Sequence, residues 1–178
     1  MTRQFADPYR AIIEQFNRRG VRYVVVGMAG INYYANNPRD AFATLDYDVL
    51  LEPTLSNAQK ALDAVHHLGF TVGTTEGALD PRQLRAMVRN RKTLVATTTD
   101  GLMLEMLLQV SGYTFSQLAE DAKTVVVKGV PTRVGQLPKL LKSKQIAGRP
   151  KDRQFLKRYA LLLEPPPSSK TRRRSIRK

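Results

Sequence analysis

Residues 44–53, TLDYDVLLEP, place two aspartates one residue apart in an otherwise apolar run. The Tyr, Val and Leu residues, closed by Pro53, are typical of a β-strand. Alternate residues of a strand point to the same face, so we expect Asp46 and Asp48 to share one face. Adjacent carboxylates repel each other, and a bound cation relieves that repulsion. The other interpretation is a pair at a strand end that faces solvent or arginines.

A hard divalent cation suits such a pair of acids. Magnesium takes oxygen ligands and is commonly held by one or two carboxylates together with substrate phosphates. Metal ions held in this way activate an attacking oxygen and stabilise a leaving one in phosphoryl-type transfer. The spacing of Asp46 and Asp48 is therefore compatible with a metal-dependent transfer site.

Glu105 is a third candidate acid, because it is the only charged residue in the apolar run GLMLEMLLQ (101–109). If the strand at 102–108 pairs beside the strand at 44–51, Glu105 joins the two aspartates. Otherwise it is a buried glutamate paired with an arginine, or an outward-facing residue. Taken alone, the run does not distinguish these possibilities.

Two further segments suggest phosphate binding. In VVVGMAG (24–30) a β-branched run leads into Gly27 and then a short helix, and glycine lets a backbone approach a phosphate closely. KSKQIAGRPKDRQF (142–155) carries basic residues that suit a triphosphate, among them Lys144, Arg149 and Lys151. The alternative interpretation of the basic segment is the solvated face of a helix pair, with Asp152 as an acid in the first turn of the second helix.

The pattern along the chain predicts an α/β (α+β) domain with a mixed sheet flanked by helices and with the last two helices packed on it. We expect this domain to span residues 1–164, and 165–178 to be a basic, disordered tail. The predicted helices cover 8–20, 28–37, 55–68, 81–88, 137–148 and 150–164. The predicted strands cover 21–27, 44–53 and 70–75, with hairpins at 92–110 and 124–135. Residues 113–122 are expected to form a loop or a short helix.

The composition narrows the class of protein. The chain of 178 residues has no cysteine, which excludes disulfides, zinc–thiolate sites and cysteine nucleophiles. It has no apolar run long enough for a membrane helix and no secretory signal, so we expect a cytoplasmic protein without a membrane partner. The net charge is +14, and six of these charges follow Glu164, which leaves +8 for residues 1–164. Such an excess favours an anionic partner such as nucleic acid or nucleotide phosphates.

In this order, the signals resemble the minimal nucleotidyltransferase superfamily, which has the DNA polymerase β-like fold. That pattern is a strand ending in G-[GS], then D-x-[DE] on the next strand and a third acid on a later one. The segment SKQIAGRPKDRQFL is similar to the lysine-plus-GR.KD segment of bacterial abortive-infection and type IV toxin nucleotidyltransferases. The resemblance spans about residues 5–163.

The resemblance implies a role for each matching residue. Asp46, Asp48 and Glu105 would be the catalytic acids and the ligands of Mg²⁺ or Mn²⁺. Gly27 would let the backbone approach the nucleotide. The other implied nucleotide- and phosphate-binding positions are Met28, Thr44, Lys144, Arg149 and Lys151.

Three positions depart from the family pattern. Met28 stands where a small Gly or Ser is preferred, and Phe42 stands where an arginine is frequent, although Arg39 lies nearby. The third acid is Glu105 where Asp is commoner. The departures bear on catalysis more than on the fold.

The resemblance implies a nucleotidyltransferase that moves a nucleoside monophosphate from a nucleoside triphosphate to an acceptor hydroxyl. The basic charge favours RNA, including tRNA, as acceptor. A toxin of a toxin–antitoxin system, with a cognate antitoxin protein as partner, fits the same resemblance. Two alternatives stay open: a catalytically degenerate nucleotide- or RNA-binding protein of the same fold, and a partner-binding protein whose basic tail docks on an acidic neighbour.

Overall fold

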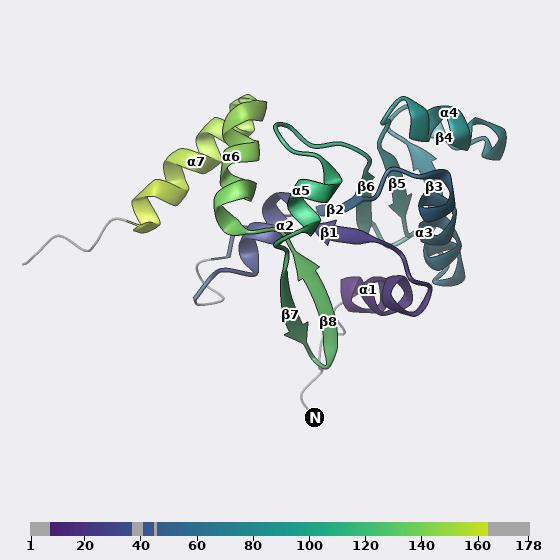
Figure 1. Cartoon of the computed structure of the whole chain (residues 1–178), viewed down its shortest axis with the longest axis horizontal. Coiled ribbons are helices and arrows are strands. Elements are labelled where there is room, and N and C mark those ends of the chain that lie inside the picture. Colours follow the sequence, from purple (N-terminus) through teal and green to yellow (C-terminus); the bar gives the residue numbers. More distant parts are fainter. Residues whose placement is uncertain (1–7, 37–40, 45, 164–178) are drawn as a thin grey trace, which may run out of the picture.

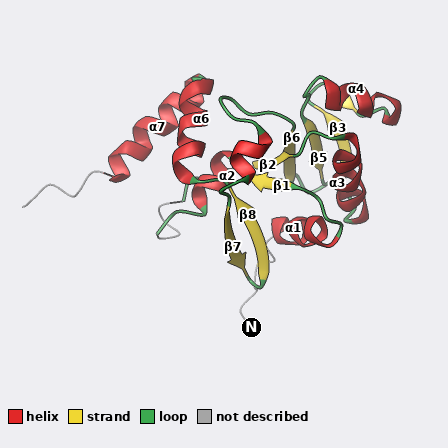
Figure 2. Cartoon of the chain, in the orientation of Figure 1, coloured by secondary structure: helices red, strands yellow, loops and turns green. Residues whose placement is uncertain are grey.

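The computed structural model describes residues 8–36, 41–44 and 46–163, and in this part helices flank a central sheet (Figures 1 and 2). The α-helices are α1 (Pro8–Arg18), α2 (Gly27–Asn32), α3 (Leu55–His67), α4 (Leu84–Arg89), α5 (Phe115–Ala119), α6 (Leu137–Ala147) and α7 (Pro150–Leu163), and a 3₁₀ helix, η2, spans Pro81–Gln83. The strands are β1 (Tyr23–Val25), β2 (Asp46–Leu51), β3 (Thr71–Thr74), β4 (Gly77–Ala78), β5 (Leu94–Thr97), β6 (Met103–Leu107), β7 (Lys123–Val127) and β8 (Val130–Val134). None of the described helices combines the length and the apolar character that crossing a membrane requires.

The strands form one mixed sheet in the order β4-β3-β5-β6-β2-β1-β8-β7. The pairs β2–β6 and β1–β8 are parallel, and the other neighbours are antiparallel. The prediction of an α+β domain with a mixed sheet is therefore confirmed. The expected pairing of the strand at 102–108 beside the strand at 44–51 is confirmed as well.

The two faces of the sheet carry different helices. One core cluster joins the inner faces of α1 and α3 to the strands through residues such as Phe16, Val65 and Val49. The second cluster joins α5, α6 and α7 to the opposite face, where Leu50 of β2 lies. Since residues of a strand alternate between faces, Asp46 and Asp48 lie on the face of Leu50. The aspartate pair is thus on the side of the sheet that α5, α6 and α7 cover.

Most elements begin and end close to the predicted positions, with four differences. The helix expected over 28–37 begins at Gly27 and ends at Asn32. The strand expected over 21–27 ends at Val25, and Gly27 is the first residue of α2, because its positive φ of 62° turns the chain into that helix. The helix expected at 81–88 is divided into η2 and α4. The two-residue strand β4 has no counterpart among the predictions, since two residues are too few to show a periodic pattern. The tail at 165–178 lies outside the described residues.

Leu140 holds α6 against the sheet. Its side chain is only 3% exposed, and it lies between two glycines of other elements. A Cβ added to Gly30 of α2 would lie 2.9 Å from its Cδ1, and one added to Gly135, after β8, would lie 2.8 Å from its Cδ2. The two glycines therefore make room for a single leucine that joins α6 to α2 and to the end of β8.

Replacing Leu140 with alanine should lower the free energy of unfolding by about 2–5 kcal/mol, because the cradle between two backbones cannot collapse to fill the cavity. Chemical denaturation of L140A measures this loss. The neighbouring Leu141 is only partly buried, so L141A is the matched control and should lose clearly less. Equal losses in the two variants would contradict the proposed anchoring role of Leu140.

Candidate active site

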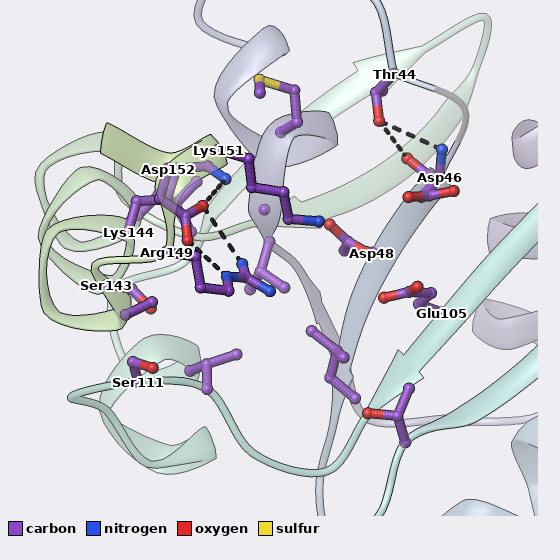
Figure 3. A pocket seen from close by; sticks show the side chains of 18 of the residues that line it. Thr44, Asp46, Asp48, Glu105, Ser111, Ser143, Lys144, Arg149, Lys151 and Asp152 are labelled. Atoms are coloured by element: carbon purple, nitrogen blue, oxygen red, sulfur yellow. Dashed lines mark hydrogen bonds and ion pairs between the residues drawn. The ribbon is translucent and has the colours of Figure 1, made fainter. Parts of the chain in front are cut away.

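The parallel pairing of β2 and β6 brings the three predicted acids to one wall of a cleft. Asp48 is directly opposite Glu105 in the register, and Asp46 is opposite Met103. All three acids line the cleft, and Figure 3 shows their carboxylates on the same side of it. Asp48 and Glu105 come from segments 57 positions apart in the sequence, so only the strand pairing makes them neighbours.

Gly27 lies directly against Asp48. Its φ of 62° is in the left-handed region, and a Cβ added to it would overlap the Asp48 carboxylate. The neighbouring backbone N–H of Val26 donates a hydrogen bond of 3.0 Å to the carbonyl of Asp48. The glycine therefore lets the β1–α2 turn approach the aspartate closely, whereas the approach of this backbone to a phosphate stays a prediction.

Asp48 is the most perturbed acid of the cleft. Burial raises its pKa from 3.8 to about 7, and the neighbouring carboxylates of Glu105 and Asp46 add to this effect. The positive charge of Lys144 opposes the shift without cancelling it. Like charges gathered at a buried position are unfavourable for the protein alone, and they become favourable around a cation.

The donor set fits a hard divalent cation in chemistry, since carboxylate oxygens are what magnesium prefers. Within the residues that the structure describes, no group of three or more acidic or histidine side chains is gathered closely enough to hold a metal ion. Magnesium in nucleotide sites is usually held by one or two carboxylates and completed by substrate phosphates and water. The adjacent Asp48 and Glu105 provide the two carboxylates that such a site needs.

The opposite wall of the cleft is basic and centres on a buried acid. Asp152, whose side chain is 1% exposed, accepts a hydrogen bond of 3.1 Å from Lys144 Nζ and one of 2.6 Å from Arg149 Nε. Burial acts to raise the pKa of Asp152, but the hydrogen bonds from Arg149 and Lys144 outweigh it, so the pKa lies below its ordinary value. Asp152 therefore stays ionised and fixes two cations at the edge of the cleft (Figure 3).

The corner between α6 and α7 explains how one acid reaches both cations. Gly148 ends α6 in the left-handed conformation with φ of 59°, and Pro150 begins α7 two residues later. This tight turn puts Asp152 in the first turn of α7, close to Arg149 before it and to Lys144 on α6. The Lys144 Nζ also lies 5.3 Å from the centre of the Phe155 ring, over its face, which is a cation–π contact.

The cleft between the two walls has a volume of about 820 Å³, which is in the range of small-molecule and cofactor sites. Lys151, which is exposed, extends across it toward Asp48 in Figure 3. The nine residues that the sequence singles out all line this cleft: Gly27, Met28, Thr44, Asp46, Asp48, Glu105, Lys144, Arg149 and Lys151. The structure thus brings together every predicted site residue, with acids on one side and cations on the other.

The positions that depart from the family pattern have structural roles here. Phe42 packs edge-on against Phe155 at 4.7 Å between ring centres, and its backbone exchanges two hydrogen bonds with the side chain of Asn32. An apolar contact with α7 thus anchors the segment before β2 at the position where an arginine is frequent. Met28 lies in the cleft wall, half-buried against the second core cluster. Arg39 falls outside the described residues.

Thr44 acts on the backbone of the site. Its hydroxyl donates a hydrogen bond of 3.0 Å to the carbonyl of Asp46 and accepts one of 3.3 Å from the same residue's N–H. It therefore fixes the first residue of β2.

Sequence reasoning did not single out Asp152, Ser111 or Ser143 as a site residue. In the alternative interpretation of the basic segment, Asp152 is an acid in the first turn of a solvated helix. It lies in the first turn of α7, but it is buried and holds Lys144 and Arg149. Its place behind a Gly-Arg-Pro turn, three residues after an arginine, is the signal that points to this role. Ser111 and Ser143 also line the cleft, and nothing in their local sequence distinguishes them from surface serines.

Comparison with known proteins gives a structural similarity and no family match. No protein-family model matches the chain, and no curated protein matches it. Among solved structures, the chain is similar to the solution structure of the antibiotic-resistance factor ANT(2'')-Ia, with 14% sequence identity and a TM-score of 0.48. The alignment covers 87% of this chain and 92% of that chain. The activity of this chain is therefore argued from its own residues.

The raised pKa of Asp48 predicts a pH-dependent cost of folding. Between pH 4 and pH 7 the unfolded chain releases this proton while the folded chain keeps it, so the acid destabilises the fold progressively as the pH rises. An Asp48→Asn variant lacks that cost, and at pH 8 it should be more stable than the original chain by at most ~4 kcal/mol. Thermal unfolding in EDTA between pH 5 and pH 8 measures the difference, which should grow with pH.

Asp63 on α3 is exposed, so Asp63→Asn is the matched control and should show no such growth. The contrary result is a stability difference between D48N and the original chain that is the same from pH 5 to pH 8. That result would show that folding does not raise the pKa of Asp48.

Proposed function

We propose that this protein is a metal-dependent nucleotidyltransferase that moves a nucleoside monophosphate from a nucleoside triphosphate to an acceptor hydroxyl on RNA. The observation that supports it is the cleft with Asp46, Asp48 and Glu105 on one wall and Lys144, Arg149 and Lys151 on the other. A triphosphate with its cation needs negative ligands for the metal and positive ligands for the phosphates, and this cleft offers both.

In the proposed reaction, the acceptor hydroxyl oxygen attacks the α-phosphorus of the nucleoside triphosphate. A new phosphodiester bond forms as the bond between the α- and β-phosphates breaks, and pyrophosphate leaves. When bound, Mg²⁺ or Mn²⁺ would supply Lewis-acid stabilisation of the charge on the phosphates and the reacting oxygens. Asp46, Asp48 and Glu105 would hold that ion.

The chain's own residues would do the remaining work. Lys151 and Arg149 would bind the β- and γ-phosphates and the departing pyrophosphate, with Lys144 and Asp152 positioning them. The open backbone at Gly27 would let the phosphates approach Asp48. Glu105, next to Asp48, would accept the proton of the acceptor hydroxyl.

The second candidate function is that of a catalytically degenerate nucleotide- or RNA-binding protein of the same fold. Two observations favour it: Met28 occupies the cleft wall where the family has a small residue, and no preformed group of three metal ligands occurs among the described residues. A toxin role with a cognate antitoxin, and docking of the basic tail at 165–178 on an acidic neighbour, stay predictions from the sequence.

Label transfer separates the two functions. The protein is incubated with Mg²⁺, each α-labelled nucleoside triphosphate in turn and total RNA, and labelled RNA is resolved on a denaturing gel. We expect transfer that needs Mg²⁺ and that falls at least 100-fold in D46A/D48A, because both metal ligands are lost.

The matched control for this variant is D63A/E76A, which removes the same charge from two exposed acids outside the cleft. It should keep the full rate of transfer. If no nucleotide is transferred to any RNA while the protein still binds RNA equally well with and without Asp46 and Asp48, the protein is the degenerate binder.

A further inference from the structure

A second basic surface lies beside the cleft, on the short helix α4 and the turn that follows it. Arg85 and Arg89 belong to α4, and Arg91 and Lys92 follow it; we call these four residues the α4 surface. All four are exposed, and the sequence has no Asp or Glu between Pro81 and Thr99. Within the described part of the chain, none of the four takes part in an ion pair.

Folding alone does not account for both arginines of α4, Arg85 and Arg89. Leu84 and Val88 are the buried residues of α4, so Arg85 and Arg89, each one position further on, point away from the core. They are four residues apart, and like charges at this spacing destabilise a helix slightly. The negative end of the helix dipole attracts a basic residue in the last turn, which explains Arg89. It does not explain Arg85, which is the second residue of the helix.

The turn after α4 is strained in a way that the other helix ends avoid. Lys92 N–H donates to the carbonyl of Met87 and Arg91 N–H to that of Val88, at 3.0 and 3.2 Å, which is the Schellman arrangement. Its left-handed position is occupied by Arg91, with φ of 54°. The ends of α1, α3 and α6 place a glycine in this conformation, namely Gly20, Gly69 and Gly148. Arg91 also has a structural role, because its Nη1 donates a hydrogen bond of 2.9 Å to the carbonyl of Pro53 and ties this turn to the segment before α3.

The α4 surface continues into the cleft. Lys92 is followed directly by Thr93, which lines the cleft together with Leu107 at the end of β6. Figure 1 shows α4 and the α6–α7 pair along the upper edge of the view, α4 on the right and α6–α7 on the left, with the loop after β6 between them. The cations inside the cleft are sufficient to bind the phosphates of a nucleoside triphosphate. If the acceptor were a small molecule, the α4 surface would therefore have no ligand.

We propose that the α4 surface binds the phosphate backbone of an RNA acceptor strand whose end lies in the cleft. A chain of phosphates carries regularly spaced negative charge, and exposed arginine and lysine side chains bind it without sequence preference. This inference rests on the proposed function and defines its acceptor as a polymer, in preference to a small hydroxyl compound.

The test removes the charge and keeps the side-chain length. R85Q/R89Q/K92Q is compared with the original chain in binding to a fluorescently labelled single-stranded RNA at several KCl concentrations. About three phosphate contacts are lost, so the slope of log K against log [KCl] should become shallower by about 2, and the affinity near 0.15 M salt should fall about tenfold or more. Thermal unfolding checks that the variant is folded.

The matched control is R10Q/R18Q/R19Q, which removes the same charge from exposed residues of α1 and the turn after it; α1 lies below α3 in Figure 1, whereas α4 lies at the upper edge. It should keep the original affinity within about twofold and the original salt slope. The proposal is overturned if the original chain does not bind RNA, if the α4 variant binds like it, or if the control weakens binding equally.

Binding does not depend on transfer, so the two proposals fail separately. RNA binding through the α4 surface without any nucleotide transfer would overturn the proposed enzyme activity, and the RNA-binding surface would stand. Transfer to a small hydroxyl compound by a chain that does not bind RNA would support a nucleotidyltransferase activity and would overturn the RNA-binding role of the α4 surface.

Discussion

The parallel pairing of β2 with β6 is the constraint on which the rest of the site depends. It sets Asp48 directly beside Glu105 on the face of the sheet that also carries Asp46 and the apolar Leu50. Burial and the neighbouring carboxylates raise the pKa of Asp48 to about 7, so the folded chain keeps a charge cluster that destabilises it. Destabilising arrangements of this kind are common at functional sites, where a ligand offsets the cost.

The basic wall follows a different principle. Lys144 and Arg149 are held by Asp152, and the resulting ion pairs are fixed by burial of the acid. Binding a phosphate to these side chains costs less conformational entropy than binding it to mobile ones, because they are already ordered. The corner at Gly148 is what allows α6 and α7 to share this acid. The site therefore combines an unsatisfied acidic wall with a preorganised basic one.

Much of the fold was predictable from the sequence, because the strands and helices carry clear periodicity and recognisable ends. The pairing of β2 with β6 was only conditional, since strand neighbours far apart in sequence are set by tertiary packing. Asp46, Asp48 and Gly27 have local signatures, namely an aspartate pair on a strand and a glycine turn. The basic cluster points to Lys144, Arg149 and Lys151, whereas Met28 and Thr44 are implied only by the family resemblance. The burial of Asp152 could not be predicted, because it depends on how α6 and α7 pack, which no local pattern reveals. In the sequence, Phe42 is a departure from the family pattern, which frequently has an arginine there. In the structure, its contact with Phe155 gives it a packing role.

The central claim is that the two walls bind a nucleoside triphosphate together with a divalent cation. Isothermal titration of a non-hydrolysable triphosphate analogue, with Mg²⁺ and then with EDTA, tests it most directly. We expect binding that requires Mg²⁺ in the original chain, because the carboxylates repel phosphate without the cation between them. We expect binding to be lost in Asp48→Asn, because the substitution removes a ligand of that cation. Equal affinity with Mg²⁺ and with EDTA would contradict the account.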